Sequence, residues 1–296
     1  LSADRKQAAR PPVARRPAMS TRRPPSLPLF GGRELHLHAA VGLVVLREQE
    51  HAARLAVEPV REPELLAGAR RGDVAAIGPL TEGLMLGGFA MQWSRSSRPA
   101  SGAEHQFSHL WDMEHHVHGG EAPSHGFKVG VATHAVTRLY EELLAEDFGA
   151  LEIAAAERAW AASPVNNEAA IRARFHGGDF VETAVTETRA KAIDAPRLRA
   201  QLRRLREEWP LICTRLRAQL LPAKEVQRRL TAVGAPTEPE QIGISRARLR
   251  DTFLRAFHIR RRFTVLDVAM RTDRLEAWLG RIFGPGAVWD TDEDRK

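Results

Sequence analysis

The spacing of apolar residues predicts a helical protein from about residue 51 onward. Apolar positions recur there at every third or fourth residue, as in amphipathic helices, and strand-like alternation is almost absent. Asp73 and Ser245 are suitable N-caps, and Gly234 is suited to end a helix. The pattern predicts helices over residues 73–93, 103–114, 125–145, 151–162, 168–175, 180–191, 196–221, 222–233, 245–261 and 264–283.

Two of these helices contain residues that disfavour a helix interior. Pro210 lies inside the predicted helix 196–221 and should kink or split it, because proline lacks the backbone N–H. The predicted helix 73–93 contains Gly83, Gly87 and Gly88, each of which costs about 1 kcal/mol relative to alanine. Close packing against another helix and backbone approach to a ligand both explain these glycines, and the sequence does not decide between them.

Residues 1–50 have a different composition. Arginine, proline and alanine dominate as far as Pro28, and proline at that density blocks helices and central strands. We expect residues 1–50 to form an irregular or disordered segment and residues 51–290 to form one helical domain. The short apolar run 39–46 follows His36 and His38, a histidine pair that we interpret as incidental rather than metal-binding.

The amino-acid composition limits the classes of binding partner and the cellular compartment that we expect. The formal net charge of +7 comes mostly from arginines interleaved with acidic residues, and aromatic residues make up only 6%, so no nucleic-acid-binding surface is indicated. The chain has no run of eighteen apolar residues, so we expect no membrane-spanning helix. Cys213 is the single cysteine, which rules out an intramolecular disulfide and favours the cytoplasm.

Histidines are concentrated between Pro99 and Val136, a window that holds seven of the twelve in the chain. His105 and His109 are four residues apart and share one helix face with Asp112, and His125 begins the next predicted helix. Three such side chains could converge on a divalent metal, although chance helical pairs are common and the spacing alone is a weak signal. We interpret His115, His116 and His118 as solvated loop residues and His134 as a structural residue.

Two further stretches resemble a known family. The first runs from Leu80–Leu84 through Ser97–His105 and ends in Arg-Pro-Ala-Ser-Gly-Ala-Glu-His. The second is His125-Gly-x-x-Val-Gly-Val-Ala-Thr133. Both resemble the sn-glycerol-1-phosphate dehydrogenases, which belong with the iron-containing alcohol dehydrogenases, glycerol dehydrogenases and dehydroquinate synthases. The late segments 234–245 and 262–267 resemble the C-terminal end of the same family.

The resemblance implies a mainly α, dehydroquinate synthase-like C-terminal helical domain that binds a metal. It implies that His105 and His125 are catalytic ligands of Zn2+ (or Fe2+ or Ni2+) and that His109 contacts the substrate. The implied reaction is reversible hydride transfer between NAD(H) or NADP(H) and dihydroxyacetone phosphate, which gives sn-glycerol 1-phosphate. A homo-oligomer is also possible on this basis.

The chain departs from the family pattern at its N-terminal side. The glycine-rich loop of a Rossmann-like domain and the aspartate that serves as third ligand have no counterpart in residues 1–50. We therefore expect a truncated or incomplete copy. A non-catalytic helical remnant that binds metal or a partner, and a glycerol dehydrogenase-like or dehydroquinate synthase-like enzyme, remain as alternatives.

Overall fold

The computed structural model describes residues 62–175, 178 and 180–291, and every regular element among them is a helix. This confirms the mainly α fold class. The expectations for residues 1–50, including His36 and His38, lie outside the described residues. The helices are α3 (Glu62–Arg71), α4 (Val74–Ser94), α5 (Ala103–Met113), α6 (His125–Ala145), α7 (Ile153–Ala162), α8 (Glu168–Arg174), α9 (Val181–Ala190), α10 (Ala195–Gln219), α11 (Ala223–Ala232), α12 (Arg246–Ala256), α13 (Val265–Arg271) and α14 (Leu275–Phe283).

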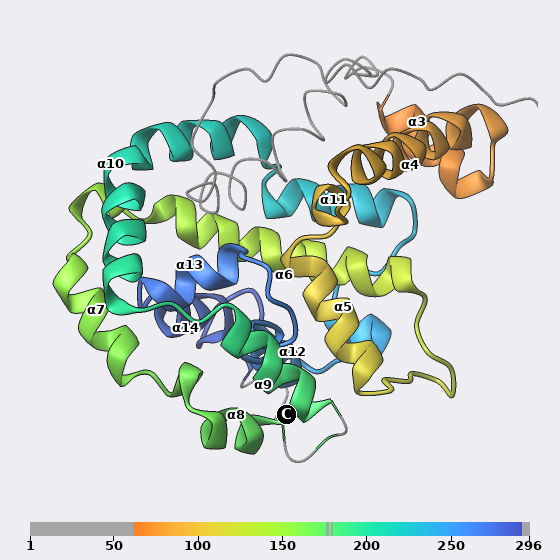
Figure 1. The fold of residues 1–296 in the computed structure, drawn as a ribbon. Coiled ribbons are helices and arrows are strands. Elements are labelled where there is room, and N and C mark those ends of the chain that lie inside the picture. Colours follow the sequence, from red (N-terminus) through yellow and green to blue (C-terminus); the bar gives the residue numbers. More distant parts are fainter. Residues whose placement is uncertain (1–61, 176–177, 179, 292–296) are drawn as a thin grey trace, which may run out of the picture. The chain divides into compact units, whose positions relative to one another are not determined.

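The central helix is α6, against which α5, α10, α11, α13 and α14 pack (Figure 1). On its buried side the apolar residues Val131, Ala135 and Leu139 are fully enclosed. Aromatic side chains fill the space between the helices. Phe107 of α5 meets Phe253 of α12 edge to face, with ring centroids 4.7 Å apart. Each fully buried side chain of this size contributes about 1.5–3 kcal/mol of stability.

Capping residues explain several of the helix boundaries. The hydroxyl of Ser245 accepts a hydrogen bond from the backbone N–H of Arg248, as expected for an N-cap, and Gly234 follows α11 with a φ of 76°. Asp73 precedes α4 as predicted, but its carboxylate pairs with Arg71 instead of capping the helix. Pro210 does not split the predicted helix, because α10 continues through this proline, and the helix bends along its length (Figure 1).

Two predicted boundaries near the C-terminus are wrong. The helix that begins after Ser245 ends at Ala256 and not near Arg261. The predicted helix 264–283 is two helices, α13 and α14, which are separated at Asp273. Asp273 has a φ of 56°, a left-handed conformation that interrupts the helix. Aspartate tolerates this conformation better than most residues, but the apolar spacing continues across it and gives no sign of the break.

His258 is a buried polar residue just after α12. Its Nδ1 donates a hydrogen bond to Thr188 Oγ1 (2.9 Å), and its ring packs edge to face against Phe175 and Phe257. Burial, together with the positive charges of Lys191 and Arg174, lowers the pKa of His258 to about 3. The imidazole is therefore neutral in the folded protein at physiological pH.

This burial predicts a pH-dependent loss of stability. Between about pH 6.5 and pH 3 the unfolded chain binds a proton at residue 258 that the folded chain does not bind, so the free energy of unfolding falls as pH falls through this range. In His258→Gln, which cannot titrate, urea unfolding should show a shallower decline below about pH 6.5 than in the wild type. If the free energy of unfolding fell equally in both proteins below pH 6.5, His258 would not be the group responsible.

Candidate functional site

The segment before α5 is held by an arginine from the C-terminal part of the chain. The Nη1 of Arg262 donates a hydrogen bond to the carbonyl oxygen of Ser101 (2.5 Å), and its Nη2 bonds the hydroxyl of Ser97. Glu104 secures the next residue, because its Oε1 accepts a hydrogen bond from the backbone N–H of Gly102 (2.6 Å). These contacts fix the backbone from which α5 starts.

His105, His109 and His125 gather at one place, as the sequence predicts. The ring centroids of His105 and His125 are 5.3 Å apart, and the ring of His109 lies 6.3 Å from the first and 6.2 Å from the second. His105 and His109 come from adjacent turns of α5, and His125 is the first residue of α6. Ser124 caps α6 by accepting a hydrogen bond from the N–H of Phe127 (3.2 Å).

Two of these histidines are anchored through Nδ1. His105 Nδ1 lies 2.8 Å from Glu104 Oε1, so it donates to the carboxylate and leaves Nε2 with a free lone pair. His125 Nδ1 lies 3.2 Å from the hydroxyl of the buried Ser108. Metal-binding histidines commonly have their second ring nitrogen bound in this way, because the contact fixes both the ring orientation and the tautomer.

The separation of the rings fits a pair of metal ligands. Two imidazoles on one tetrahedral zinc ion have ring centroids about 5 Å apart, because the Zn–N distance is about 2.0–2.1 Å. The distance between His105 and His125 matches this value. Within residues 62–175, 178 and 180–291, however, no group of three histidine, cysteine, aspartate or glutamate side chains is arranged to hold a metal. The described residues therefore fit two imidazole ligands and not a complete site.

The nearby carboxylates are engaged elsewhere. Glu104 accepts hydrogen bonds from His105 and Gly102, and although burial raises its pKa, these bonds outweigh that effect and keep it below the usual value. Asp112 shares the face of His105 and His109, as expected, but it pairs with the buried Lys128 of α6. Neither carboxylate replaces the aspartate ligand that the sequence lacks.

Positive charge borders the cluster. Burial lowers the pKa of His109, and the nearby guanidinium of Arg260 lowers it further, so this imidazole is neutral at pH 7. Arg260 and Arg98 also act on Arg262, whose pKa is lowered by burial first and by these two charges next. The side chain of Arg260 is exposed. The histidines thus lie beside a region that favours an anion.

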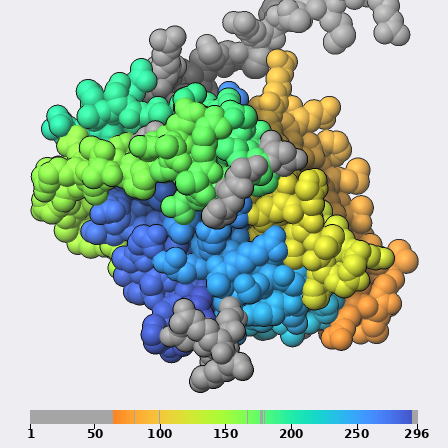
Figure 2. All heavy atoms as spheres, turned by 90° about the horizontal axis from the view of Figure 1, so that it is seen from below, coloured from red at the N-terminus to blue at the C-terminus, as the bar shows by residue number. Residues whose placement is uncertain are grey.

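The interpretation of the histidine-rich loop needs one correction. His116 is buried and not solvated: its Nε2 donates to the carbonyl oxygen of Ile242 (2.7 Å), and its Nδ1 accepts from Arg248 (2.8 Å). The adjacent Glu114 pairs with Arg248 and Arg255 of α12, and on the face in Figure 2 this loop (yellow) lies beside α12 (light blue). His115 and His118 are exposed, as expected.

His134 is structural, as predicted. It is fully buried on α6, and its Nδ1 donates to the carbonyl oxygen of Thr237 (2.9 Å). Sequence reasoning missed Ser108, Glu104 and Arg262 as supports of the cluster. Glu104 adjoins His105 within the quoted motif, so a signal existed for it, whereas the contacts of Arg262 with the loop before α5 have no local signal in the sequence.

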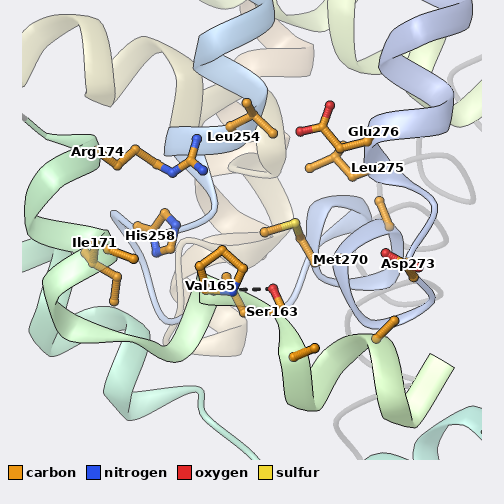
Figure 3. A pocket seen from close by; sticks show the side chains of 15 residues that line it. Ser163, Val165, Ile171, Arg174, Leu254, His258, Met270, Asp273, Leu275 and Glu276 are labelled. Atoms are coloured by element: carbon orange, nitrogen blue, oxygen red, sulfur yellow. Dashed lines mark hydrogen bonds between the residues drawn. The ribbon is translucent and has the colours of Figure 1, made fainter. Parts of the chain in front are cut away.

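A cavity of about 350 Å³ lies elsewhere in the fold, and it is bordered by residues of α7, α8, α12, α13 and α14. Arg174 and His258 stand on one side of it, with Asp273 and Glu276 on the other (Figure 3). It shares no lining residue with the histidine cluster. Of its two carboxylates, Glu276 is paired with Arg250, which lies outside the cavity lining.

Comparison with known proteins identifies relatives. Over 62 residues the chain is 50% identical to the glycerol-1-phosphate dehydrogenase (NAD(P)+) of Halalkalibacterium halodurans. This match covers 21% of this chain and 16% of that enzyme. Over 207 residues it is 28% identical to the enzyme of the same name from Geobacillus stearothermophilus, which covers 69% of this chain and 40% of the relative. Over 85 residues it is 39% identical to that of Hyperthermus butylicus, which covers 28% of this chain and 23% of the relative.

The chain spans at most 40% of the length of these three relatives. No family model matches the chain, and no solved structure matches it significantly. Each relative is nevertheless a glycerol-1-phosphate dehydrogenase, in agreement with the resemblance of the histidine motifs. The chain is therefore similar, over part of its length, to several glycerol-1-phosphate dehydrogenases.

Proposed function

We propose that this chain is the helical, metal-binding part of an NAD(P)-dependent sn-glycerol-1-phosphate dehydrogenase, and that it works in the cytoplasm. The observation that carries the proposal is the convergence of His105, His109 and His125 from two helices at one place. The names of the relatives supply the reaction. Dihydroxyacetone phosphate, NAD(P)H and a proton would give sn-glycerol 1-phosphate and NAD(P)+.

His105 and His125 would hold a divalent metal through Nε2, with zinc, Fe2+ and Ni2+ as the candidates. Such an ion acts as a Lewis acid that polarises a carbonyl oxygen. Glu104 and Ser108 would keep the two rings in place by holding Nδ1. Neither a third ligand nor a nucleotide-binding unit is found within residues 62–175, 178 and 180–291, so the cofactor experiment below is the decisive one.

His109 and Arg260 would position the substrate. The imidazole of His109 is neutral at pH 7, so it can both donate and accept a hydrogen bond, and it is suited to orient a hydroxyl or carbonyl group of the substrate. The guanidinium of Arg260 is near His109, exposed and always charged, as a residue that attracts a phosphate should be. The pair would distinguish a phosphorylated triose from an uncharged one.

A second candidate function is metal binding without turnover. It is favoured by the incomplete ligand set within the described residues and by the 40% coverage of the Geobacillus stearothermophilus enzyme. Both functions predict that the chain binds a divalent metal, but only the dehydrogenase predicts that it binds NAD(P)H. Metal binding and cofactor binding are therefore tested in separate experiments.

The metal assignment predicts the behaviour of a double variant. His105→Ala with His125→Ala removes both imidazole ligands and should abolish zinc retention after gel filtration, measured by metal analysis. The matched control is His115→Ala with His118→Ala, which removes two exposed histidines of the loop and should leave the zinc content unchanged. Unchanged zinc in the first variant would rule out the site.

The dehydrogenase assignment predicts oxidation of NADH on addition of dihydroxyacetone phosphate to the zinc-loaded chain, followed by absorbance, together with binding of NADH followed by fluorescence. Arg260→Ala should raise the KM for dihydroxyacetone phosphate roughly tenfold or more and change kcat less, because its contact is with the phosphate. The neighbouring Arg261→Ala is the matched control, since Arg261 is paired with Glu187.

Failure to bind NADH at millimolar concentration would contradict the dehydrogenase assignment for this chain and leave the metal-binding function. Turnover of glycerol but not of its phosphate would indicate glycerol dehydrogenase-like chemistry instead.

A further inference from the structure

The cavity bordered by α7, α8, α12, α13 and α14 has the size and lining of a site for a small ligand. Its volume is about 350 Å³, and ligand-binding cavities in proteins measure about 300–1,000 Å³. Much of its lining is aliphatic, with Val165, Ile171, Leu254, Met270 and Leu275 among the contributing side chains. These side chains offer an apolar surface on which a short hydrocarbon group can pack.

One ring nitrogen of His258 is an unused hydrogen-bond acceptor at this cavity. The side chain is 2% exposed and borders the cavity. The hydroxyl of Thr188 donates its single hydrogen to the carbonyl oxygen of Ala184 (2.7 Å), so His258 Nδ1 is the donor in its 2.9 Å contact with Thr188. The neutral ring therefore keeps a lone pair on Nε2, on the side of the ring away from Thr188, which is not a lining residue.

This acceptor calls for a donor from outside the chain. Within residues 62–175, 178 and 180–291, no group donates a hydrogen bond to Nε2 of His258. A buried acceptor that is left without a donor costs free energy, and a ligand with a hydrogen-bond donor at this point would remove that cost.

Positive charge surrounds the same acceptor. The charged groups that act on His258 are Lys191 and Arg174. Lys191 lies 3.3 Å from Asp267, which partly balances its charge, whereas Arg174 forms no ion pair with a described side chain. Arg174 stands beside His258 at the cavity (Figure 3). An anionic group is therefore favoured next to Arg174, and the donor to Nε2 should be an uncharged hydroxyl rather than an ammonium group.

The opposite side of the cavity is acidic. Asp273 and Glu276 stand there, and both are exposed (Figure 3). Glu276 is paired with Arg250, but Asp273 forms no ion pair with a described side chain. A second carboxylate on a ligand would be repelled at this side, so the cavity favours a monocarboxylate.

We propose that this cavity binds a small aliphatic 2-hydroxy acid. Its carboxylate pairs with the guanidinium of Arg174, and its hydroxyl donates a hydrogen bond to Nε2 of His258. A 2-hydroxy acid carries these two groups on neighbouring carbon atoms, in keeping with the neighbouring positions of Arg174 and His258 (Figure 3). The hydrocarbon part packs on the aliphatic lining. No lining residue belongs to the cluster of His105, His109 and His125, so the two sites are separate.

A series of five-carbon ligands tests each contact by isothermal titration calorimetry on the full chain. The dissociation constant of 2-hydroxypentanoate should be about 1 mM or lower. Pentanoate lacks the hydroxyl and norvaline has an ammonium group in its place, so each should bind roughly tenfold more weakly or worse. The second carboxylate of 2-hydroxyglutarate should weaken binding by a similar factor, because it would lie near Asp273.

Two variants at the cavity have opposite expected effects. Arg174→Gln removes the partner of the carboxylate and should weaken binding of 2-hydroxypentanoate roughly tenfold or more. The matched control is Asp273→Asn, since asparagine also tolerates the φ of 56° at this position. This variant should bind 2-hydroxypentanoate as the wild type does and should bind 2-hydroxyglutarate more tightly than the wild type does. Circular dichroism verifies that both variants keep the wild-type helix content.

A third variant separates this site from the proposed metal site, because a 2-hydroxy acid can also bind zinc. His105→Ala with His125→Ala should bind 2-hydroxypentanoate as tightly as the wild type, whether or not the dehydrogenase assignment holds. The proposal would be overturned by the absence of saturable binding at about 10 mM 2-hydroxypentanoate, or by loss of binding in this double variant. Equal affinity in Arg174→Gln, or equal binding of norvaline, would also overturn it.

Discussion

The packing of α5 against α6 and α12 is the constraint on which the candidate site depends. Phe107, Leu110 and Trp111 are fully buried on one side of α5, and their burial fixes the rotation of the helix about its axis. At 100° per residue, His105 and His109 must then lie on the opposite side, where His125 meets them. The apolar side of α5 thus determines the direction in which its histidines point, and a change in this core would move the site.

Polar contacts from the C-terminal part of the chain hold α5 at both of its ends. At the start, Arg262 bonds the loop that leads into the helix. At the far end, Glu114 pairs with Arg248 and Arg255 of α12. These contacts span more than 130 residues of sequence, so the position of the histidines depends on completion of the fold rather than on local helix formation. A truncation after α11 would remove all three arginines.

Much of this fold could be predicted from the sequence, because most helices keep a clear apolar period and several begin at a capping residue. The failures arose where tertiary contacts or one backbone conformation overrode that period. The break at Asp273 requires a positive φ that no pattern announces, and the burial of His116 depends on Arg248 and Ile242, which are distant in sequence. The three site histidines were predicted from their spacing and from the resemblance, whereas their supports Ser108 and Arg262 become recognisable only when the helices are packed.

The central claim is that His105 and His125 bind one divalent metal ion. X-ray absorption spectroscopy of the zinc-loaded chain tests it most directly, because imidazole ligands give characteristic scattering from the ring atoms beyond the first shell. The account predicts two imidazole nitrogens at about 2.0–2.1 Å from zinc. It also predicts that this imidazole scattering is lost in His105→Gln with His125→Gln. A first shell of oxygen atoms alone in the wild type, or imidazole scattering that persists unchanged in the variant, would contradict it.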